Sequence, residues 1–384
     1  MNLDEIRKSI DETDDEILKL FSARMKLCEQ VADYKAKNGM PVFQGGREKQ
    51  VLEGIESKTE QHLKAASRLL FSQIMEISKC LQTERLTESE YGQVSNSALS
   101  ENPKIACPGI RGSYTEEACF RVFGKDAQID YFDTFDRVFE AVRKNEAEYG
   151  IVPIENSTAG GVDGTYELLS RYDMHICKRL SIPVNHVLAA RSRDCAVNTV
   201  ISHEQALHQC QGFLKEIGCK TRTAPNTSIA ARDVAQGEGK DTACICSQHC
   251  AELNNLEVIK RNIADNSENF TRFIVISKDL QIEENADIIS VCLSLPHVTG
   301  SLYRLLTKFN YCGLNLTKIE SRPMPDHIKK LSQTSDKENF EVIFYLDFEG
   351  SLQNPSVSKL LKSLEKECVY YRFLGNYCDM DKKS

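Results

Sequence analysis

Apolar side chains recur at helical spacing through residues 1–86, where glycine and proline are scarce. Residues 3–38 carry one long helical pattern, which Pro41, Gly45 and Gly46 interrupt. A second, shorter helix is expected to begin at Arg47-Glu48. The third helix carries a heptad stripe, which consists of Leu63, Ala66, Leu70, Ile74, Ile77 and Leu81. The pattern predicts an all-α helical domain at residues 1–88.

Polar positions on these helices add a feature that a bundle used only for dimerisation would not need. Arg24 and Lys35 are eleven residues apart, which places them on nearly the same helical face with Cα atoms roughly 16 Å apart. Two long cationic side chains at that spacing could hold a small dianion between them. Ser78 and Gln82 form an i,i+4 polar pair beside the heptad stripe. The polar pattern therefore favours a small-anion site within the bundle.

The residue composition and the apolar pattern change twice after the helical segment. Residues 89–102 are polar and Ser-rich and are expected to form a linker. From Lys104 onward, short apolar strands alternate with helical stretches, which predicts an α/β domain at residues 103–280. After a break at residues 281–285, the order strand–helix–strand–strand–helix–strand predicts an α+β domain at residues 287–380.

Three strings in the α/β segment place polar side chains where apolar strands begin or end. They are Tyr149–Ser157, Ile201–Cys210 and Asn269–Phe273. In α/β folds, ligands bind near the carboxyl ends of the strands. A glycine-rich turn at Gly109–Tyr114 lies between a short strand and a helix, which is a weak signal for an anion.

Composition narrows the class of protein further. The formal net charge is −8, which argues against nucleic acid or an anionic membrane as a partner. No run of about 18 apolar residues is present and the N-terminus lacks an apolar signal segment, so we expect a cytoplasmic protein. The 15 cysteines are expected to be small buried side chains in a reducing compartment. The spacing of Cys244, Cys246, His249 and Cys250 does not suit zinc, so no metal is predicted.

The polar set of the first segment resembles the active-site pattern of the all-helical chorismate mutase family over residues 3–86. The matching residues are Arg7, Arg24, Lys35, Arg47-Glu48, Ser78 and Gln82. Gln44 stands where the family usually has aspartate. The resemblance makes Arg47, Gln44 and Ser78 substrate-binding residues.

The chemistry of that family suits these residue types. Chorismate rearranges by a pericyclic shift, so the protein has to hold the compact conformer of the dicarboxylate and stabilise charge on the ether oxygen. The resemblance implies that Arg24 and Arg7 bind the two carboxylates. It also implies that Lys35 and Gln82 donate to the ether oxygen, and that Glu48 holds the ring hydroxyl.

The three strings of the second segment resemble the prephenate dehydratase family, whose fold has two α/β lobes around a cleft, like the periplasmic binding proteins. Its reaction expels CO2 and water, and aromatisation drives it without a cofactor. The resemblance implies that Thr271 assists the departing hydroxyl and that Arg272 lies near a substrate carboxylate. Asn156, Ser202 and Gln209 would position the substrate.

The third segment resembles the ACT domain, a βαββαβ unit that binds amino acids between protomers. The strings that carry the resemblance are Pro296–Leu302, Asn315–Ile319 and Glu320–Pro323. Residues 324–339 are expected to form a polar loop. The resemblance implies a site for phenylalanine made by Gly300, Ser301, Leu302, Glu320, Ser321, Arg322 and Pro323.

Together these resemblances predict a multidomain bifunctional enzyme of phenylalanine biosynthesis, a homodimer or homotetramer that L-phenylalanine inhibits. It would convert chorismate to prephenate and prephenate to phenylpyruvate. Two alternatives stay open: arogenate as the dehydratase substrate, and a non-catalytic amino-acid sensor. Arg7 lies 17 residues before Arg24, roughly 25 Å along a continuous helix, so a catalytic Arg7 would have to serve the site of a partner protomer.

Overall fold

The structure, a computed structural model, describes residues 2–40, 45–86, 99–162, 164–237, 239–331 and 342–382. The chain divides into two compact units. One contains residues 1–94 and 291–372, and the other contains residues 95–290 and 373–384. The predicted linker at 89–102 lies mostly outside the described residues. At its end, however, the Ser100 amide donates to the Tyr149 hydroxyl at 3.1 Å, so this part packs onto the second unit.

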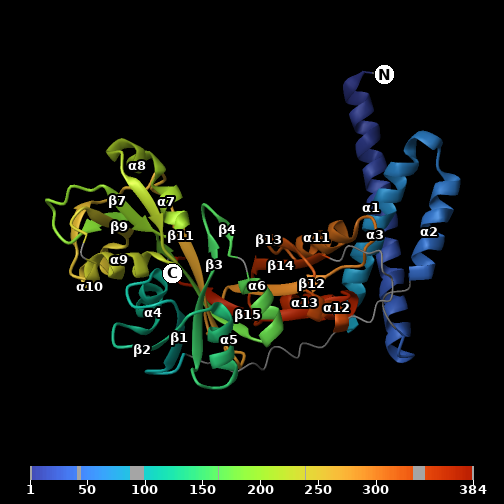
Figure 1. The fold of residues 1–384 in the computed structure, drawn as a ribbon. Coiled ribbons are helices and arrows are strands. Elements are labelled where there is room, and N and C mark those ends of the chain that lie inside the picture. The colour runs from blue at the N-terminus through green and yellow to red at the C-terminus, as the bar shows by residue number, and fades with distance from the viewer. Residues whose placement is uncertain are drawn as a thin grey trace. The chain divides into compact units, whose positions relative to one another are not determined.

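The helices of the first segment follow the predicted order, although the second helix begins at Gly45, two residues before the expected start (Figure 1). They are α1 Leu3–Lys37, α2 Gly45–Lys58, the short 3-10 helix Gln61–Leu63 and α3 Lys64–Leu86. A capping box formed by Asn2 and Glu5 begins α1, and no glycine or proline interrupts it. Its continuity keeps Arg7 and Arg24 on one rigid element.

Much of the predicted apolar stripe is exposed within one chain. Buried side chains of α1 are confined to its C-terminal half, at Met25, Ala32 and Lys35. In the heptad stripe, Leu63 of the 3-10 helix and Leu70 of α3 are 46% and 55% exposed. Intrachain packing therefore uses only part of the apolar surface that the sequence provides.

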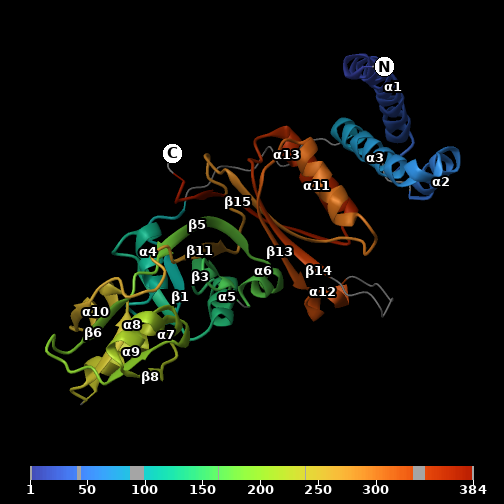
Figure 2. The ribbon, with the colours of Figure 1, turned by 90° about the horizontal axis from the view of Figure 1, so that it is seen from above.

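The remainder of the first unit belongs to the predicted βαββαβ segment. Its elements are β12 Ile288–Ser294, α11 Ser301–Tyr311, β13 Leu316–Pro323, α12 Asp326–Leu331, β14 Val342–Glu349, α13 Pro355–Glu367 and β15 Tyr370–Asp379. The strand order is β13-β14-β12-β15, and α11 and α13 lie on the same face of this sheet (Figure 2). The predicted order of elements is confirmed.

One local expectation is wrong in this segment. The polar loop predicted at residues 324–339 contains the short helix α12. Met324 and Ile328 are 2% and 1% exposed, so two apolar anchors order a stretch whose average composition is polar. Residues 332–341 lie outside the described residues.

The second unit contains two lobes, each built on its own sheet. In the first lobe the strand order is β5-β11-β3-β1-β2, with β4 beside β3. The strand β5 also pairs with β15, so the strands of the βαββαβ segment continue this sheet. Its elements are β1 Lys104–Pro108, α4 Tyr114–Phe123, β2 Gln128–Phe132, α5 Phe135–Arg143, β3 Tyr149–Asn156, β4 Gly160–Gly161, α6 Thr165–Tyr172, β5 His175–Pro183 and β11 Phe270–Ser277. The pair β3–β11 is antiparallel and places Thr271 opposite Asn156.

The second lobe has a five-stranded sheet in the order β10-β6-β9-β7-β8. Its elements are β6 Val187–Ala190, β7 Thr199–Ser202, α7 Glu204–Gln209, α8 Gln211–Ile217, β8 Lys220–Thr223, α9 Thr227–Gln236, β9 Thr242–Cys246, α10 Gln248–Leu253 and β10 Glu257–Lys260. The chain enters this lobe after β5 and returns to the first lobe at β11, so two connections join the lobes.

The cysteine-rich string of β9 and α10 belongs to the core of the second lobe. Cys244, Cys246 and Cys250 are fully buried among apolar side chains. Among the described residues, no group of three or more His, Cys, Asp or Glu side chains is placed to hold a metal ion. A search of the same residues found no helix long and apolar enough to span a membrane.

Candidate active sites

A cavity of about 490 Å³ lies between the two lobes of the second unit. The first lobe contributes Asn156 and Thr271 to its lining, and the second contributes Gln209. Three of the five residues predicted for the dehydratase site are therefore brought to one cavity, although they are far apart in the sequence. This position is the one that the ends of the predicted strands indicated.

Asn156 and Thr271 form a hydrogen-bonded pair on neighbouring strands. The Asn156 side-chain amide donates to Thr271 Oγ1 at 3.0 Å and to the carbonyl of Phe270 at 3.1 Å. Its Oδ1 accepts from the backbone amides of Thr158 and Ala159, at 3.1 and 3.0 Å, which fixes the orientation of the amide group. Because Thr271 Oγ1 accepts from Asn156, its own proton is available for a ligand in the cavity.

Arg272 and Ser202 are not brought to the cavity. Arg272 donates to Glu155 at 2.8 Å and is absent from the described lining residues, because neighbouring residues of a strand point to opposite faces. Ser202 is completely buried and donates to the carbonyl of Ile245 at 2.7 Å, which ties β7 to β9. Neither side chain lines the cavity, and their expected contacts with a substrate stay predictions.

His186 was missed by the analysis of the sequence, although it lies in the cavity wall. Its Nδ1 is 3.2 Å from the Tyr114 hydroxyl and its Nε2 is 3.0 Å from Gln209 Oε1. Burial lowers the pKa of His186 below its usual value, although the hydrogen bond with Gln209 opposes this shift. The imidazole therefore favours its neutral form, which can orient Gln209. The glycine-rich turn before Tyr114 and the string that contains Gln209 were the sequence signals near this group.

The N-termini of two helices face the cavity from opposite lobes. Ser113, Tyr114 and Thr115 begin α4, and Asn226, Thr227 and Ser228 begin α9. The first amides of a helix lack intrahelical partners and carry partial positive charge. Among the described residues that line the cavity, neither lysine nor arginine occurs. Backbone amides are therefore the main source of positive potential that this wall offers to an anion.

A second polar cluster lies where α1 meets α3 in the first unit. Lys35 Nζ is 3.4 Å from Gln82 Oε1, and the Arg24 guanidinium donates to Ser78 Oγ at 2.5 Å. Lys35, Ser78 and Gln82 are each less than a tenth exposed. Burial lowers the pKa of Lys35, while Cys28 and Glu48 oppose the shift. The cluster joins the side chains whose spacing predicted a small-anion site.

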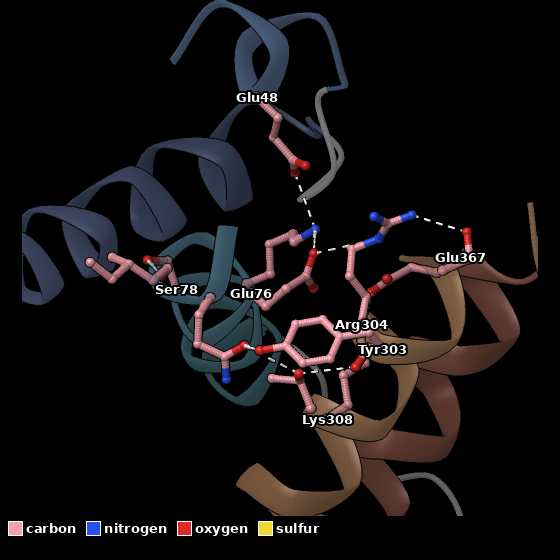
Figure 3. A network of polar contacts seen from close by, with 12 residues as sticks. Glu48, Glu76, Ser78, Tyr303, Arg304, Lys308 and Glu367 are labelled. Atoms are coloured by element: carbon pink, nitrogen blue, oxygen red, sulfur yellow. Dashed lines mark hydrogen bonds and ion pairs between the residues drawn. The ribbon is translucent and has the colours of Figure 1, made fainter. Parts of the chain in front are cut away.

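Glu48 of α2 lies beside this cluster, where Lys79 Nζ is 3.2 Å from its Oε1 (Figure 3). Arg47 is exposed, and Gln44 lies outside the described residues. The Arg7 side chain is 67% exposed and pairs with Asp4 at 3.6 Å. With 17 residues of unbroken helix between them, Arg7 is roughly 25 Å from Arg24 along α1.

The residues predicted to bind phenylalanine lie on two separate segments. Gly300 precedes α11 with φ of 81°, a backbone conformation that favours glycine, and Ser301 Oγ donates to the carbonyl of Pro296 at 2.6 Å. On β13, Arg322 Nε donates to Glu320 Oε1 at 3.1 Å. Leu302 is 36% exposed, and Ser321 and Pro323 are exposed.

Comparison with known proteins matches both parts of the chain. The family model described as "Chorismate mutase type II" matches residues 6–83, and the model described as "Prephenate dehydratase" matches residues 105–281. A bifunctional chorismate mutase/prephenate dehydratase of Aquifex aeolicus is 30% identical over 381 residues, covering 98% of this chain and 97% of the relative.

Two further relatives each match about three quarters of the chain. An Arabidopsis thaliana protein described as arogenate dehydratase/prephenate dehydratase 2 is 32% identical over 308 residues, or 78% of this chain and 77% of the relative. The solved structure of a prephenate dehydratase from Arthrobacter aurescens, in complex with L-Phe, has a TM-score of 0.64 and 29% identity. That match covers 73% of this chain and 91% of the other.

Proposed function

The chain belongs to the bifunctional chorismate mutase/prephenate dehydratase family, and on that premise we propose that it catalyses two consecutive steps of phenylalanine biosynthesis. The first is the rearrangement of chorismate to prephenate, and the second is the conversion of prephenate to phenylpyruvate. The observation that carries the proposal is the match to the Aquifex protein over nearly the whole length of both chains. The two polar clusters provide a separate site for each step.

In the mutase site, the cluster between α1 and α3 would hold the substrate dianion. Arg24, with Ser78 beside it, would bind one carboxylate, and Lys35 and Gln82 would donate to the ether oxygen. Glu48 would accept a hydrogen bond from the ring hydroxyl. No proton has to move in this pericyclic step, so the contribution of these groups is orientation and electrostatic stabilisation.

Arg7 is too far along α1 to give the site of its own chain a second guanidinium group for the other carboxylate of chorismate. We propose that Arg7 acts in the site of a partner protomer, within a homodimer or a homotetramer. The exposed apolar residues of α1 support this arrangement, since they offer a surface for a partner helix: Ile6, Ile10, Ile17 and Leu20 are each more than 40% exposed.

In the dehydratase cavity, Thr271 would act on the ring hydroxyl of prephenate. The bond from the ring carboxylate to the ring breaks and its electrons enter the ring, CO2 leaves, and the C–O bond breaks as the ring becomes aromatic. The departing hydroxide needs a proton to become water, and the Thr271 hydroxyl is placed to donate a hydrogen bond to it, because Asn156 occupies its acceptor side. The N-termini of α4 and α9 would bind the carboxylates.

Prephenate is the favoured substrate because the mutase segment of the same chain produces it. Arogenate carries an amine in place of the keto group and is the second candidate, since the matching Arabidopsis protein is described with both names. Steady-state kinetics with each substrate separate the two possibilities. We expect kcat/KM to be larger for prephenate, and a larger value for arogenate would overturn this assignment.

Residues 287–380 would form an ACT domain that binds L-phenylalanine as a feedback inhibitor. The order of strands and long helices, with α12 as an additional short helix, and the likeness to the L-Phe complex from Arthrobacter support this assignment. The site would combine Gly300, Ser301 and Leu302 of one protomer with the segment 320–323 of another. The domain boundaries 1–88, 103–280 and 287–380, with a linker at 89–102, remain part of the proposal. Cytoplasmic location is also proposed, and the free thiols of all 15 cysteines are consistent with it.

Gly300→Val and Glu320→Ala are expected to abolish inhibition by phenylalanine while the uninhibited dehydratase rate persists. The feedback coupling should be about 1–3 kcal/mol in the unmodified protein. Dehydratase rates with and without phenylalanine, together with calorimetry, measure both effects. Gly313→Val is the matched control, since Gly313 also has a positive φ and no atom within 4 Å of an added Cβ. Unchanged phenylalanine binding in both test variants would place the effector site elsewhere.

A further inference from the structure

Lys79 is a buried cation next to the mutase cluster that the proposed mechanism does not use. It lies on α3 between Ser78 and Gln82, and its side chain is 9% exposed. Its Nζ is 2.6 Å from Glu76 Oε1 and 3.2 Å from Glu48 Oε1 (Figure 3). One ammonium group therefore bridges a carboxylate of α3 and a carboxylate of α2.

Charged groups of α1, α2, α3 and α11 lie around this ammonium group. Glu76, which is 2% exposed, and Glu48 are its two anions, and Lys35 of α1 also interacts with Glu48. From α11, Arg304 Nε is 4.0 Å from the Glu76 oxygen that Lys79 contacts. Burial opposes the charge of Lys79, but the attraction and hydrogen bonds of Glu76 and Glu48 outweigh it and raise the pKa of this lysine.

The ion pair of Lys79 and Glu48 matters because a bound substrate dianion would repel the Glu48 carboxylate. It is a carboxylate in a site proposed to receive a dianion, and repulsion between like charges is strong where water is excluded. A carboxylate in that position either turns away or takes up a proton. In both cases it stops accepting a hydrogen bond from the ring hydroxyl. A cation held on the other side of the Glu48 carboxylate would prevent both the turning away and the uptake of a proton.

We propose that Lys79 is a positioning residue of the mutase: it keeps Glu48 ionised and directed at the ring hydroxyl of chorismate, and Glu76 is the buried anchor that fixes Lys79. The inference rests on the proposed role of Glu48 in the mutase site. Arg304 of α11 adds a second positive charge next to Glu76. The two carboxylates, Glu48 and Glu76, and the two cations, Lys79 and Arg304, therefore carry no net charge together.

Lys79→Met tests the proposal, because it keeps the length of the side chain and removes the charge. We expect mutase kcat/KM to fall by roughly 10-fold or more at neutral pH. In the variant, Glu76 and the substrate dianion repel the Glu48 carboxylate without a compensating cation, which favours uptake of a proton by Glu48. Mutase activity should therefore fall as the pH is lowered and recover at higher pH.

The unmodified chain and Lys79→Arg should show no such pH dependence between about pH 6 and 8, because both keep a cation beside Glu48. Arg68→Met is the matched control. Arg68 also joins α3 to α2, through Glu56 at 2.5 Å, but it is 54% exposed and lies outside the cluster. This variant should keep the mutase rate and its pH profile.

The double variant Lys79→Met/Glu76→Gln keeps the test valid if the single variant folds poorly. It removes the buried charge of Glu76 together with that of Lys79, so Glu48 is the one carboxylate left of the two that contact Lys79. Mutase activity of the double variant should still fall as the pH is lowered. This fall should occur at lower pH than in Lys79→Met, because the repelling charge of Glu76 is gone. A double variant with the rate and the flat profile of the unmodified chain would overturn the proposal.

Two outcomes for Lys79→Met would also overturn it. Unchanged mutase kinetics would make the ion pair purely structural. A higher KM with unchanged kcat and a flat pH profile would make Lys79 a direct ligand of the substrate. Dehydratase activity measured on each variant shows that the second unit is folded, and circular dichroism shows whether the helical content of the chain is kept. Absence of mutase activity in the unmodified chain would contradict the proposed function itself, which is a separate result.

Discussion

Thr271→Ala is expected to lower the dehydratase rate by roughly 10² or more and to leave mutase turnover unchanged. The Thr271 hydroxyl is the donor that Asn156 orients toward the cavity, and alanine removes it without adding volume. The hydroxide that leaves prephenate would then depart without a positioned hydrogen bond. Steady-state assays of both reactions on the same purified variant measure the two rates.

Two further variants sharpen this result. Thr271→Ser keeps a hydroxyl at the same position and should recover a large part of the dehydratase rate. Thr221→Ala removes a threonine hydroxyl from the exposed strand β8 and should have no effect on either reaction. A dehydratase rate that is unaltered in Thr271→Ala would exclude Thr271 from the mechanism.

Arg7→Ala and Arg24→Ala should each abolish most mutase activity when purified alone, and activity should return when the two variants are mixed. Arg7 cannot reach the Arg24 cluster of its own chain, because α1 is continuous between them. If Arg7 serves the partner's site, a mixed dimer contains one site with both defects and one site with neither. Equal mixing after reversible unfolding should therefore restore about a quarter of the unmodified activity.

Mass spectrometry of the intact assembly confirms that mixed dimers have formed. The dehydratase activity of each preparation is the internal control for refolding, since neither substitution lies in the second unit. No recovery in confirmed mixed dimers would mean that Arg7 acts within its own chain. Full mutase activity of Arg7→Ala alone would remove it from catalysis.

The helices and the positions of the sites were predictable because local patterns decide them. The spacing of Arg24 and Lys35 on one helical face follows from helix geometry, and the structure places both beside α3. The strand ends at Asn156 and Thr271 were identified for the same reason. Each is a polar residue at the end of an apolar strand.

Other features depend on tertiary contacts that the sequence does not reveal. Arg272 follows Thr271 directly, yet the alternation of the strand directs it to Glu155 on the neighbouring strand. Ser202 resembles a ligand-binding serine at a strand end, but the adjacent strand β9 takes its hydroxyl. Lys79 looks like an ordinary helical lysine, and only the approach of α2 shows that it bridges two carboxylates.

The central claim is that one chain carries both active sites, and chorismate supplied as the only substrate tests it most directly. Prephenate and phenylpyruvate are followed over time with purified protein and no other enzyme. The account predicts that phenylpyruvate appears with the unmodified chain, whereas Thr271→Ala stops at prephenate. Chorismate left unconverted, or prephenate accumulating without phenylpyruvate in the unmodified chain, would contradict it.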